Sequence, residues 1–197
     1  MRKLVVDDIA DLRAYERERE DLRREIISLK KARRVDVGPF VTMVFENTDT
    51  MRWQVQEMAR VERMLRDEQI AHEVETYNRL IPDAGELSAT LMIELTSEVA
   101  LRHWLPQLVD IEFHVAIVAA DGSRVPGRTS EEDESRLTRA ETTSAVHFLR
   151  FTFTPREIDA FAAGPVRIVI DHPAYEHETV LDDVRHAALL GDLRAAD

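Results

Sequence analysis

Residues 50–66, TMRWQVQEMARVERMLR, place four apolar side chains and one carboxylate on a single stripe of a predicted helix. The five positions are Met51, Val55, Met58, Glu62 and Leu65. They follow one another at intervals of three and four residues, which is the periodicity of one helix face. A carboxylate on a buried face must be paired, hydrogen-bonded, protonated or bound to a cation, since leaving it bare costs several kcal/mol. The stripe therefore predicts a helix whose buried face holds a charged group with a partner.

The segments around this helix predict an α+β fold in a single domain, residues 1–197. A long N-terminal helix is expected over residues 8–34, and shorter helices over 68–79, 97–108, 155–164 and 179–190. Strands are expected at 40–45, 88–95, 111–119, 143–153 and 166–170. Because these strands lie irregularly among the helices, we expect a mixed, mainly antiparallel sheet of five or six strands packed with helices. Residues 126–141 are polar and acidic, and they predict a mobile loop.

The composition excludes several classes of function. A formal net charge of −12 opposes binding to nucleic acid, because phosphates would be repelled. The chain has no cysteine, so disulfides and cysteine-ligated clusters are excluded. The longest apolar runs have the length of strands and not of membrane-spanning helices. We therefore expect a cytoplasmic protein that binds neither nucleic acid nor membranes.

Carboxylates and a histidine between residues 45 and 94 predict a metal site. The candidate ligands are Glu57, Glu62, His72 and Glu94. Oxygen and imidazole ligands of this kind suit iron, manganese or zinc. The alternative for Glu62 is a structural ion pair with Arg19, because each is the misplaced charge on the apolar stripe of its own helix.

A second candidate metal site follows the last predicted strand. Asp171 and His172 are potential ligands there, and loops at strand ends commonly carry sites. The string Asp-His-Pro is equally typical of a turn. His147 shares its strand face with Leu149 and Phe151, which predicts a hydrogen-bonded core histidine rather than a ligand.

A further set of polar residues predicts a site for a small anionic ligand. Arg33, Arg34 and Arg150 could hold a carboxylate or phosphate through their guanidinium groups. The other candidate ligand-binding residues are Glu46, Asn47, Gln54, Tyr77 and Asn78. The alternative for Arg33 and Arg34 is favourable charge near the end of the first helix, on a solvated face.

Six strings occur together that resemble a known family. They are RRVDVGP at 33–39, FEN at 45–47, QVQEM at 54–58, YNRLIP at 77–82, ELSATL at 86–91 and SAVHFLRF at 144–151. Over most of its length the chain resembles a bacterial family of unknown function, whose members are often encoded beside rubrerythrin-like proteins and iron–sulfur oxidoreductases. The resemblance implies a context in cytoplasmic redox or peroxide metabolism, and it carries no catalytic residue or cofactor.

Three hypotheses about function follow. The first is an accessory protein that binds a metal ion or small ligand and serves a redox protein partner. The alternative is an enzyme acting on a small anionic substrate, with Glu57 or Glu62 as the general base. The third is a structural or oligomeric interaction protein, in which the first helix forms a homodimer through the stripe that includes Leu22 and Ile26.

Overall fold

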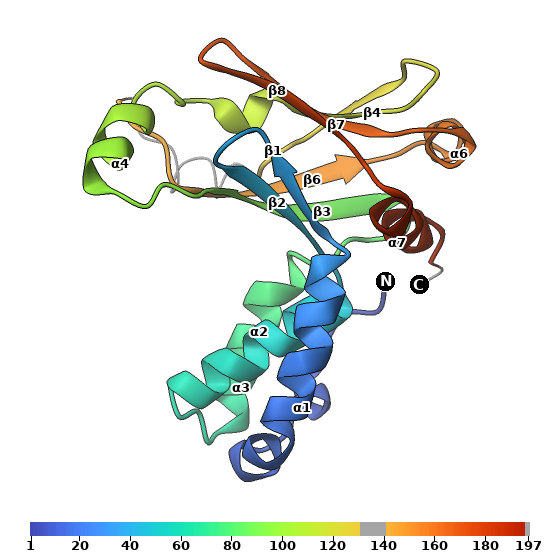
Figure 1. Ribbon diagram of the computed structural model, residues 1–197. Helices are drawn as coiled ribbons and strands as arrows, with labels where there is room; N and C mark the ends of the chain where they lie inside the picture. Colours follow the sequence, from blue (N-terminus) through green and yellow to red (C-terminus); the bar gives the residue numbers. More distant parts are fainter. Residues whose placement is uncertain (131–140, 196–197) are drawn as a thin grey trace.

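The computed structural model describes residues 1–130 and 141–195, which form a head of β-strands and an arm of three helices (Figure 1). The head holds two sheets that face each other. The arm consists of α1 (Leu12–Lys31), α2 (Thr48–Val61) and α3 (Asp67–Asn78), which extend away from one end of the head. The first residues of the chain and the C-terminal end of α7 (Asp183–Arg194) lie close to the junction of head and arm.

Each sheet has four strands, and all neighbouring strands are antiparallel. The first sheet has the order β1–β2–β3–β6 and contains β1 (Arg34–Val37), β2 (Val41–Glu46), β3 (Glu86–Ile93) and β6 (Val146–Thr152). The second has the order β5–β4–β7–β8 and contains β4 (Val115–Val118), β5 (Arg124–Pro126), β7 (Arg167–His172) and β8 (Tyr175–Val180).

The main apolar core lies between the two sheets, because alternate residues of each strand point inward. Phe45, Leu91 and Phe151 of the first sheet belong to this core and are fully buried. Ile117 and Ile168 of the second sheet face them and are buried to the same degree. The other face of the first sheet is consequently free to carry polar side chains.

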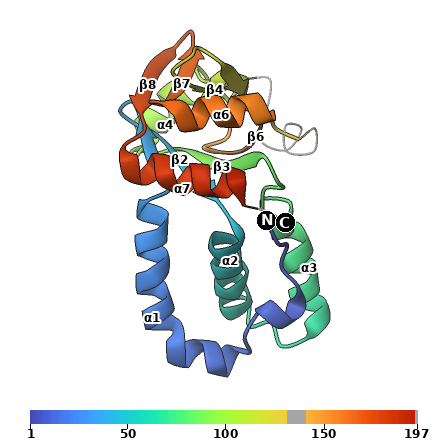
Figure 2. The same ribbon diagram turned by 90° about the vertical axis from the view of Figure 1, so that its right-hand side faces the viewer.

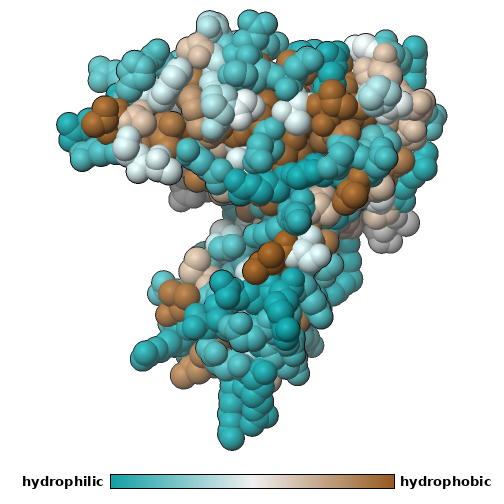
Figure 3. Space-filling view, in the orientation of Figure 1, coloured by the Kyte–Doolittle hydropathy of each residue, from teal (hydrophilic) through white to brown (hydrophobic). Residues whose placement is uncertain are grey.

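The helical arm has a smaller core of its own. Met51 and Val55 of α2 pack with Val74 of α3 and with Leu4 and Ile81. α1 contributes little to burial, since Tyr15 and Ile26 are the buried residues among its 20. The arm is consequently hydrophilic over much of the surface seen in Figure 3.

The other helices among the described residues are α4 (Glu98–Trp104), α6 (Pro155–Ala163) and α7 (Asp183–Arg194), which lie in the head. Short 3-10 helices lie at Val6–Asp8 in the arm and at Ile111–His114 in the head. α7 runs along the head where it meets the arm, beside β3 (Figure 2). None of the helices in the described ranges combines the length and apolar content needed to cross a bilayer.

The predicted α+β class, the antiparallel strands and the long N-terminal helix are confirmed, but the strands differ in number and grouping. Within residues 1–130 and 141–195, eight strands form two sheets, rather than five or six forming one. β1 begins at Arg34, where the first helix was expected to end, and β8 was not predicted. α1 begins at Leu12 rather than at residue 8, because the Asp11 side chain caps the helix by accepting hydrogen bonds from the next turn.

The carboxylate predicted on a buried stripe is not buried, and this expectation was wrong. α2 ends at Val61, and Glu62 is its C-terminal cap. Arg63 then takes a left-handed φ of 52°, which turns the chain away from the helix. Glu62 is exposed, and Leu65 is 81% exposed. The buried stripe therefore ends before Glu62.

Part of the loop predicted at 126–141 can be compared with the structure. Pro126 ends β5, and Arg128 forms a bridge to Arg150 of β6. Residues 131–140, which include most of the acidic residues of the predicted loop, lie outside the described residues. The mobility predicted for this loop stays a prediction.

Candidate functional site

A pocket of about 780 Å3 lies where the C-terminal end of α3 meets β3 and β6. We call it the basic pocket. The lining residues include Lys3, Glu75, Tyr77, Asn78, Arg79, Asp83, Ser88, Arg128, Phe148 and Arg150. The pocket brings together three of the eight predicted ligand-binding residues, namely Tyr77, Asn78 and Arg150.

Strand register explains why polar side chains gather on the floor of the basic pocket. Glu46 of β2 pairs with Ser88 of β3, and Ser88 pairs with Arg150 of β6. Side chains in register on adjacent antiparallel strands point to the same face. The outer face of the first sheet therefore carries a carboxylate, a hydroxyl and a guanidinium in one row, and Ser88 and Arg150 line the pocket.

The basic pocket has the opposite sign of charge to the chain as a whole. Its charged lining residues are four cationic ones, Lys3, Arg79, Arg128 and Arg150, and two acidic ones, Glu75 and Asp83. Four positive and two negative lining charges, with Glu86 pairing with Arg150 from just outside the lining, give a local balance of about +1, whereas the chain carries −12. A cleft lined mainly by one sign of charge raises the local concentration of ions of the opposite sign.

Arg150 and Arg128 stand side by side in the basic pocket. The Arg150 guanidinium donates hydrogen bonds to the Glu86 carboxylate and to the carbonyl oxygen of Arg79, which fix its position. The backbones of Arg128 and Arg150 exchange two hydrogen bonds of 2.9 and 2.8 Å, so their side chains start from directly opposed positions. Arg128 is exposed. A fixed guanidinium beside an exposed one can hold a planar anion from two sides.

The N-terminal segment forms part of the pocket wall. Lys3 Nζ lies 2.8 Å from Asp83 Oδ1, and this hydrogen bond lowers the pKa of the Asp83 carboxyl. The Asn78 side chain accepts a hydrogen bond of 2.8 Å from the Leu4 N–H and donates one of 3.0 Å to the Leu4 carbonyl oxygen. The amide of Asn78 therefore holds the N-terminal segment against α3.

Glu46 is a buried carboxylate with one unpaired oxygen. The residue is 5% exposed, and its Oε1 accepts a hydrogen bond of 2.8 Å from Thr90 Oγ1. Its Oε2 has no hydrogen-bond partner among the described residues. An unpaired buried oxygen costs free energy, and such atoms in native proteins call for an explanation. Its register next to Ser88 places it beside the pocket floor.

The structure does not bring the four predicted metal ligands together. Glu62 is exposed at the end of α2, His72 is exposed on α3, and Glu94 is exposed after β3, where it pairs with Arg34. Glu57 is held by Arg19 and Tyr15, as described below. Within residues 1–130 and 141–195, no group of three or more His, Asp or Glu side chains is placed to hold a metal ion.

The predicted second metal site consists of residues that have protein partners. Asp171 accepts a hydrogen bond from Arg124, and its Oδ1 lies 3.2 Å from His114 Nδ1. His172 is buried, and its Nε2 lies 3.0 Å from the carbonyl oxygen of Val109. These contacts join β7 to β5 and to the segment after α4. They agree with the alternative prediction that Asp171-His172-Pro173 forms a turn.

The remaining predicted ligand-binding residues lie apart from the basic pocket. Arg33 is buried in an ion pair with Asp192, and Arg34 contacts Glu94 and Thr42. Asn47 is the N-cap of α2, where its side chain accepts from the Thr50 N–H. Gln54 is half-buried on α2.

Arg19 pairs with Glu57, not with Glu62. Arg19 donates two hydrogen bonds to the Glu57 carboxylate, of 2.7 and 2.9 Å, and the Tyr15 hydroxyl donates a third of 2.6 Å. These contacts, Arg19 first, lower the pKa of Glu57 to about 2. Burial and the same carboxylate raise the pKa of Tyr15. The pair joins α1 to α2, and a carboxylate held in this way is too weak a base for the general-base role considered above.

Replacing Glu57 with glutamine is expected to lower stability by about 1 to 2 kcal/mol at pH 7, since the pair is partly exposed. Because folding lowers the pKa of Glu57 from 4.5 to about 2, its contribution is complete above pH 4.5 and is lost as the pH falls toward 2. Urea denaturation at several pH values should show the two stability curves converging over that interval. Glu62→Gln is the control, and a gap for Glu57→Gln that stays constant down to pH 2 would contradict the assignment.

Sequence reasoning missed two features of the site and its surroundings. No sequence pattern indicated that Lys3, Arg79 and Arg128 belong to a site, because exposed cationic residues are common on any protein surface. Glu112, which is 1% exposed, also went unnoticed; its Oε2 lies 3.6 Å from His147 Nδ1. His147 is a core histidine as predicted, with Nε2 at 2.9 Å from Thr143 Oγ1, and burial lowers its pKa.

Comparison with known proteins identifies relatives without an assigned activity. Residues 3–193 match a family described as a protein of unknown function, DUF3501. A crystal structure described as a novel protein of unknown function from Burkholderia pseudomallei K96243 is similar, with 36% sequence identity and a TM-score of 0.89. The similarity covers 98% of this chain and 100% of that one. No curated protein matches the chain.

Proposed function

The chain belongs to the DUF3501 family of unknown function, and we propose that it binds a small anionic ligand in the basic pocket, as an accessory protein. The observation that carries the proposal is the reversal of charge: a pocket with about one net positive charge, after the pairing of Arg150 with Glu86 is counted, on a chain of net charge −12. A pocket without a function on so acidic a surface would be expected to have a lining of net negative charge. Electrostatic attraction therefore favours an anion here over the rest of the surface.

The contacts available in the basic pocket favour a carboxylate or phosphate group on a short body. Arg128 and Arg150 supply adjacent guanidinium groups for the anion. Tyr77 and Phe148 supply aromatic surface for the remainder of the ligand.

The metal ion and the redox protein partner predicted from the sequence stay predictions. The anion proposal is independent of both, because every contact it uses belongs to side chains of this chain. It also differs from the enzyme hypothesis, since Glu57 is engaged with Arg19 and Glu62 lies at the end of α2.

The proposal predicts that inorganic phosphate and succinate stabilise the protein at constant ionic strength. For a dissociation constant of ~1 mM, 20 mM ligand would add about 1.8 kcal/mol to the free energy of unfolding. Thermal unfolding, with isothermal titration calorimetry for affinity, would measure the effect. Replacing Arg128 with alanine is expected to weaken binding about tenfold, because one charge-assisted hydrogen-bond donor is lost.

Arg124→Ala is the matched control for Arg128→Ala. Arg124 is also an exposed arginine, but it pairs with Asp171 on the second sheet and does not line the basic pocket. Both variants change the net charge of the protein by the same amount. The proposal would be lost if neither anion stabilised the wild-type protein beyond chloride, or if the two variants lost equal affinity.

A further inference from the structure

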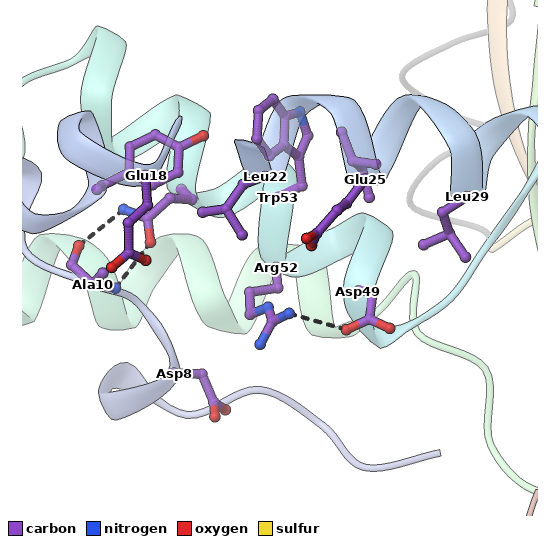
Figure 4. A pocket seen from close by; sticks show the side chains of 12 residues that line it. Asp8, Ala10, Glu18, Leu22, Glu25, Leu29, Asp49, Arg52 and Trp53 are labelled. Carbon is purple, nitrogen blue, oxygen red and sulfur yellow. Dashed lines mark hydrogen bonds and ion pairs between the residues drawn. The ribbon is translucent and has the colours of Figure 1, made fainter. Parts of the chain in front are cut away.

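A second hollow lies in the arm, between α1 and α2 (Figure 4). Its volume is about 500 Å3, and it is lined along α1 from Tyr15 to Leu29. We call it the arm groove. Two hydrogen bonds of 2.9 Å between the Gln56 side chain and the backbone of Ala10 tie the segment before α1 to α2. At a rise of 1.5 Å per residue the lined part of α1 is ~21 Å long.

Apolar and aromatic side chains line the arm groove. Leu22, Ile26 and Leu29 lie at helical spacing on α1 and line it together, and Trp53 lies across from them on α2. Trp53 meets Tyr15 edge to face, with 6.0 Å between the ring centroids, which fixes the indole. Leu22, Leu29 and Trp53 are each half-buried. A stripe of this kind on a long, thinly packed helix is the surface that a further helix could cover.

The rim of the arm groove is acidic. Asp8, Glu18, Glu25 and Asp49 line it, and Arg52 is the basic residue among the lining side chains. Figure 4 shows Arg52 directed to Asp49, at a distance of 3.2 Å between Nη2 and Oδ1. Four acidic residues and one basic residue line the groove, and Arg2 pairs with Asp8 from outside the lining, which leaves about two net negative charges around an apolar floor. The complementary surface is apolar along one side and positively charged along its edges.

We propose that the arm groove docks a basic amphipathic helix of a partner protein. An apolar groove about four helical turns long matches the apolar face of such a helix, with anchors at intervals of three and four residues. Lysine or arginine flanking that face would meet Glu18 and Glu25 on one side and Asp49 on the other. This inference stands apart from the anion proposal, because the basic pocket and the arm groove share no lining residue.

A second copy of the chain is a poorer occupant than a basic helix. In a twofold dimer through this surface, each arm groove would face its own equivalent. Two rims of about two net negative charges each would then oppose each other, which is destabilising. A dimer that covers Trp53 is therefore an outcome that would overturn the proposal.

The test uses a synthetic, roughly 14-residue peptide with leucine at helical a and d positions and lysine and alanine elsewhere. Two control peptides carry glutamate in place of lysine, or the same residues in an order that abolishes the apolar face. Tryptophan fluorescence of the full-length protein reports binding, since Trp53 lies in the arm groove, and a Trp53→Phe variant separates its signal from that of Trp104. We expect saturable binding of the first peptide and at least tenfold weaker binding of both controls.

Charge reversal on α1 supplies the matched variants. Glu25→Lys should weaken the basic peptide at least tenfold and strengthen binding of the glutamate peptide. Glu20→Lys changes the net charge equally, but Glu20 is exposed on α1 and does not line the arm groove. Equal losses in the two variants, equal binding of the reordered peptide, or a wild-type dimer disrupted by Glu25→Lys would each overturn the proposal.

Discussion

Replacing Arg33 with alanine is expected to lower the free energy of unfolding by about 3 to 5 kcal/mol, because it leaves a buried carboxylate without its partner. Arg33 is 5% exposed and Asp192 is 8% exposed. Two hydrogen bonds join them, one of them 2.8 Å long between Nη2 and Oδ1, in the bidentate geometry that favours arginine. The pair fixes α7 to the junction between α1 and β1, so its loss should also loosen the C-terminal helix.

Urea denaturation followed by circular dichroism measures this effect, and Arg34→Ala is its control. Arg34 is the neighbouring residue, but its ion pair with Glu94 is about 40% exposed at both side chains, so its loss should cost less than about 1 kcal/mol. The double variant Arg33→Met with Asp192→Leu should recover most of the stability, because it leaves no unpaired charge. Equal effects of Arg33→Ala and Arg34→Ala would contradict a structural role for the pair.

The ion pairs also show how much of the structure could be predicted from the sequence alone. An ion pair between Arg19 of the first helix and Glu62 was predicted, and in the structure Arg19 does pair with a carboxylate of α2, but that carboxylate is Glu57. The acidic partner was misplaced by five residues, because the apolar pattern of α2 continues through Leu65 although the helix ends at Val61. The left-handed turn at Arg63 ends the helix, and no glycine or proline marks that position.

Physical reasons account for the absence of β1 and β8 from the expected strands. β1 has four residues, and its charged positions continue the basic run that ends the first helix. β8 is an edge strand whose side chains are mostly exposed, so YEHETV lacks the apolar alternation by which strands are recognised. The main core strands were found because their inward positions are apolar.

The candidate site was predictable in part for a similar reason. The sequence around Tyr77, Asn78 and Arg150 has the mixture of polar and apolar residues that is typical of a partly buried polar surface. All three residues line the basic pocket. The opposition of Arg128 to Arg150 depends on a bridge between segments 22 residues apart in the chain. Pairing between distant segments is fixed by the tertiary fold, and one sequence carries no periodic signal for it.

Replacing Gly38 with alanine is expected to cost about 3 to 5 kcal/mol, the other large effect that we predict. Gly38 has a φ of +76° in the turn between β1 and β2, a conformation that disfavours a side chain. A Cβ atom there would lie 2.5 Å from the Tyr175 hydroxyl oxygen and 2.6 Å from the His177 ring. Tyr175 or the turn would have to move.

The Tyr175 hydroxyl is costly to displace because it joins the two sheets. It donates a hydrogen bond of 2.8 Å to the carbonyl oxygen of Val37 and accepts from the backbone N–H groups of Phe40 and Val41. Burial of this side chain raises the pKa of the phenol. The glycine therefore allows β8 of the second sheet to approach the β1–β2 turn of the first, and alanine would break that contact.

Gly122→Ala separates the backbone cost from the steric one. Gly122 has a similar φ of +85°, but a Cβ atom there would meet nothing within 4 Å. We expect this variant to lose about 1 to 2 kcal/mol, the penalty of the left-handed conformation alone. The difference between the two variants in thermal or urea denaturation then measures the close approach of the sheets. Equal losses would mean that Tyr175 and His177 move aside without cost, and that the contact does not hold the two sheets together.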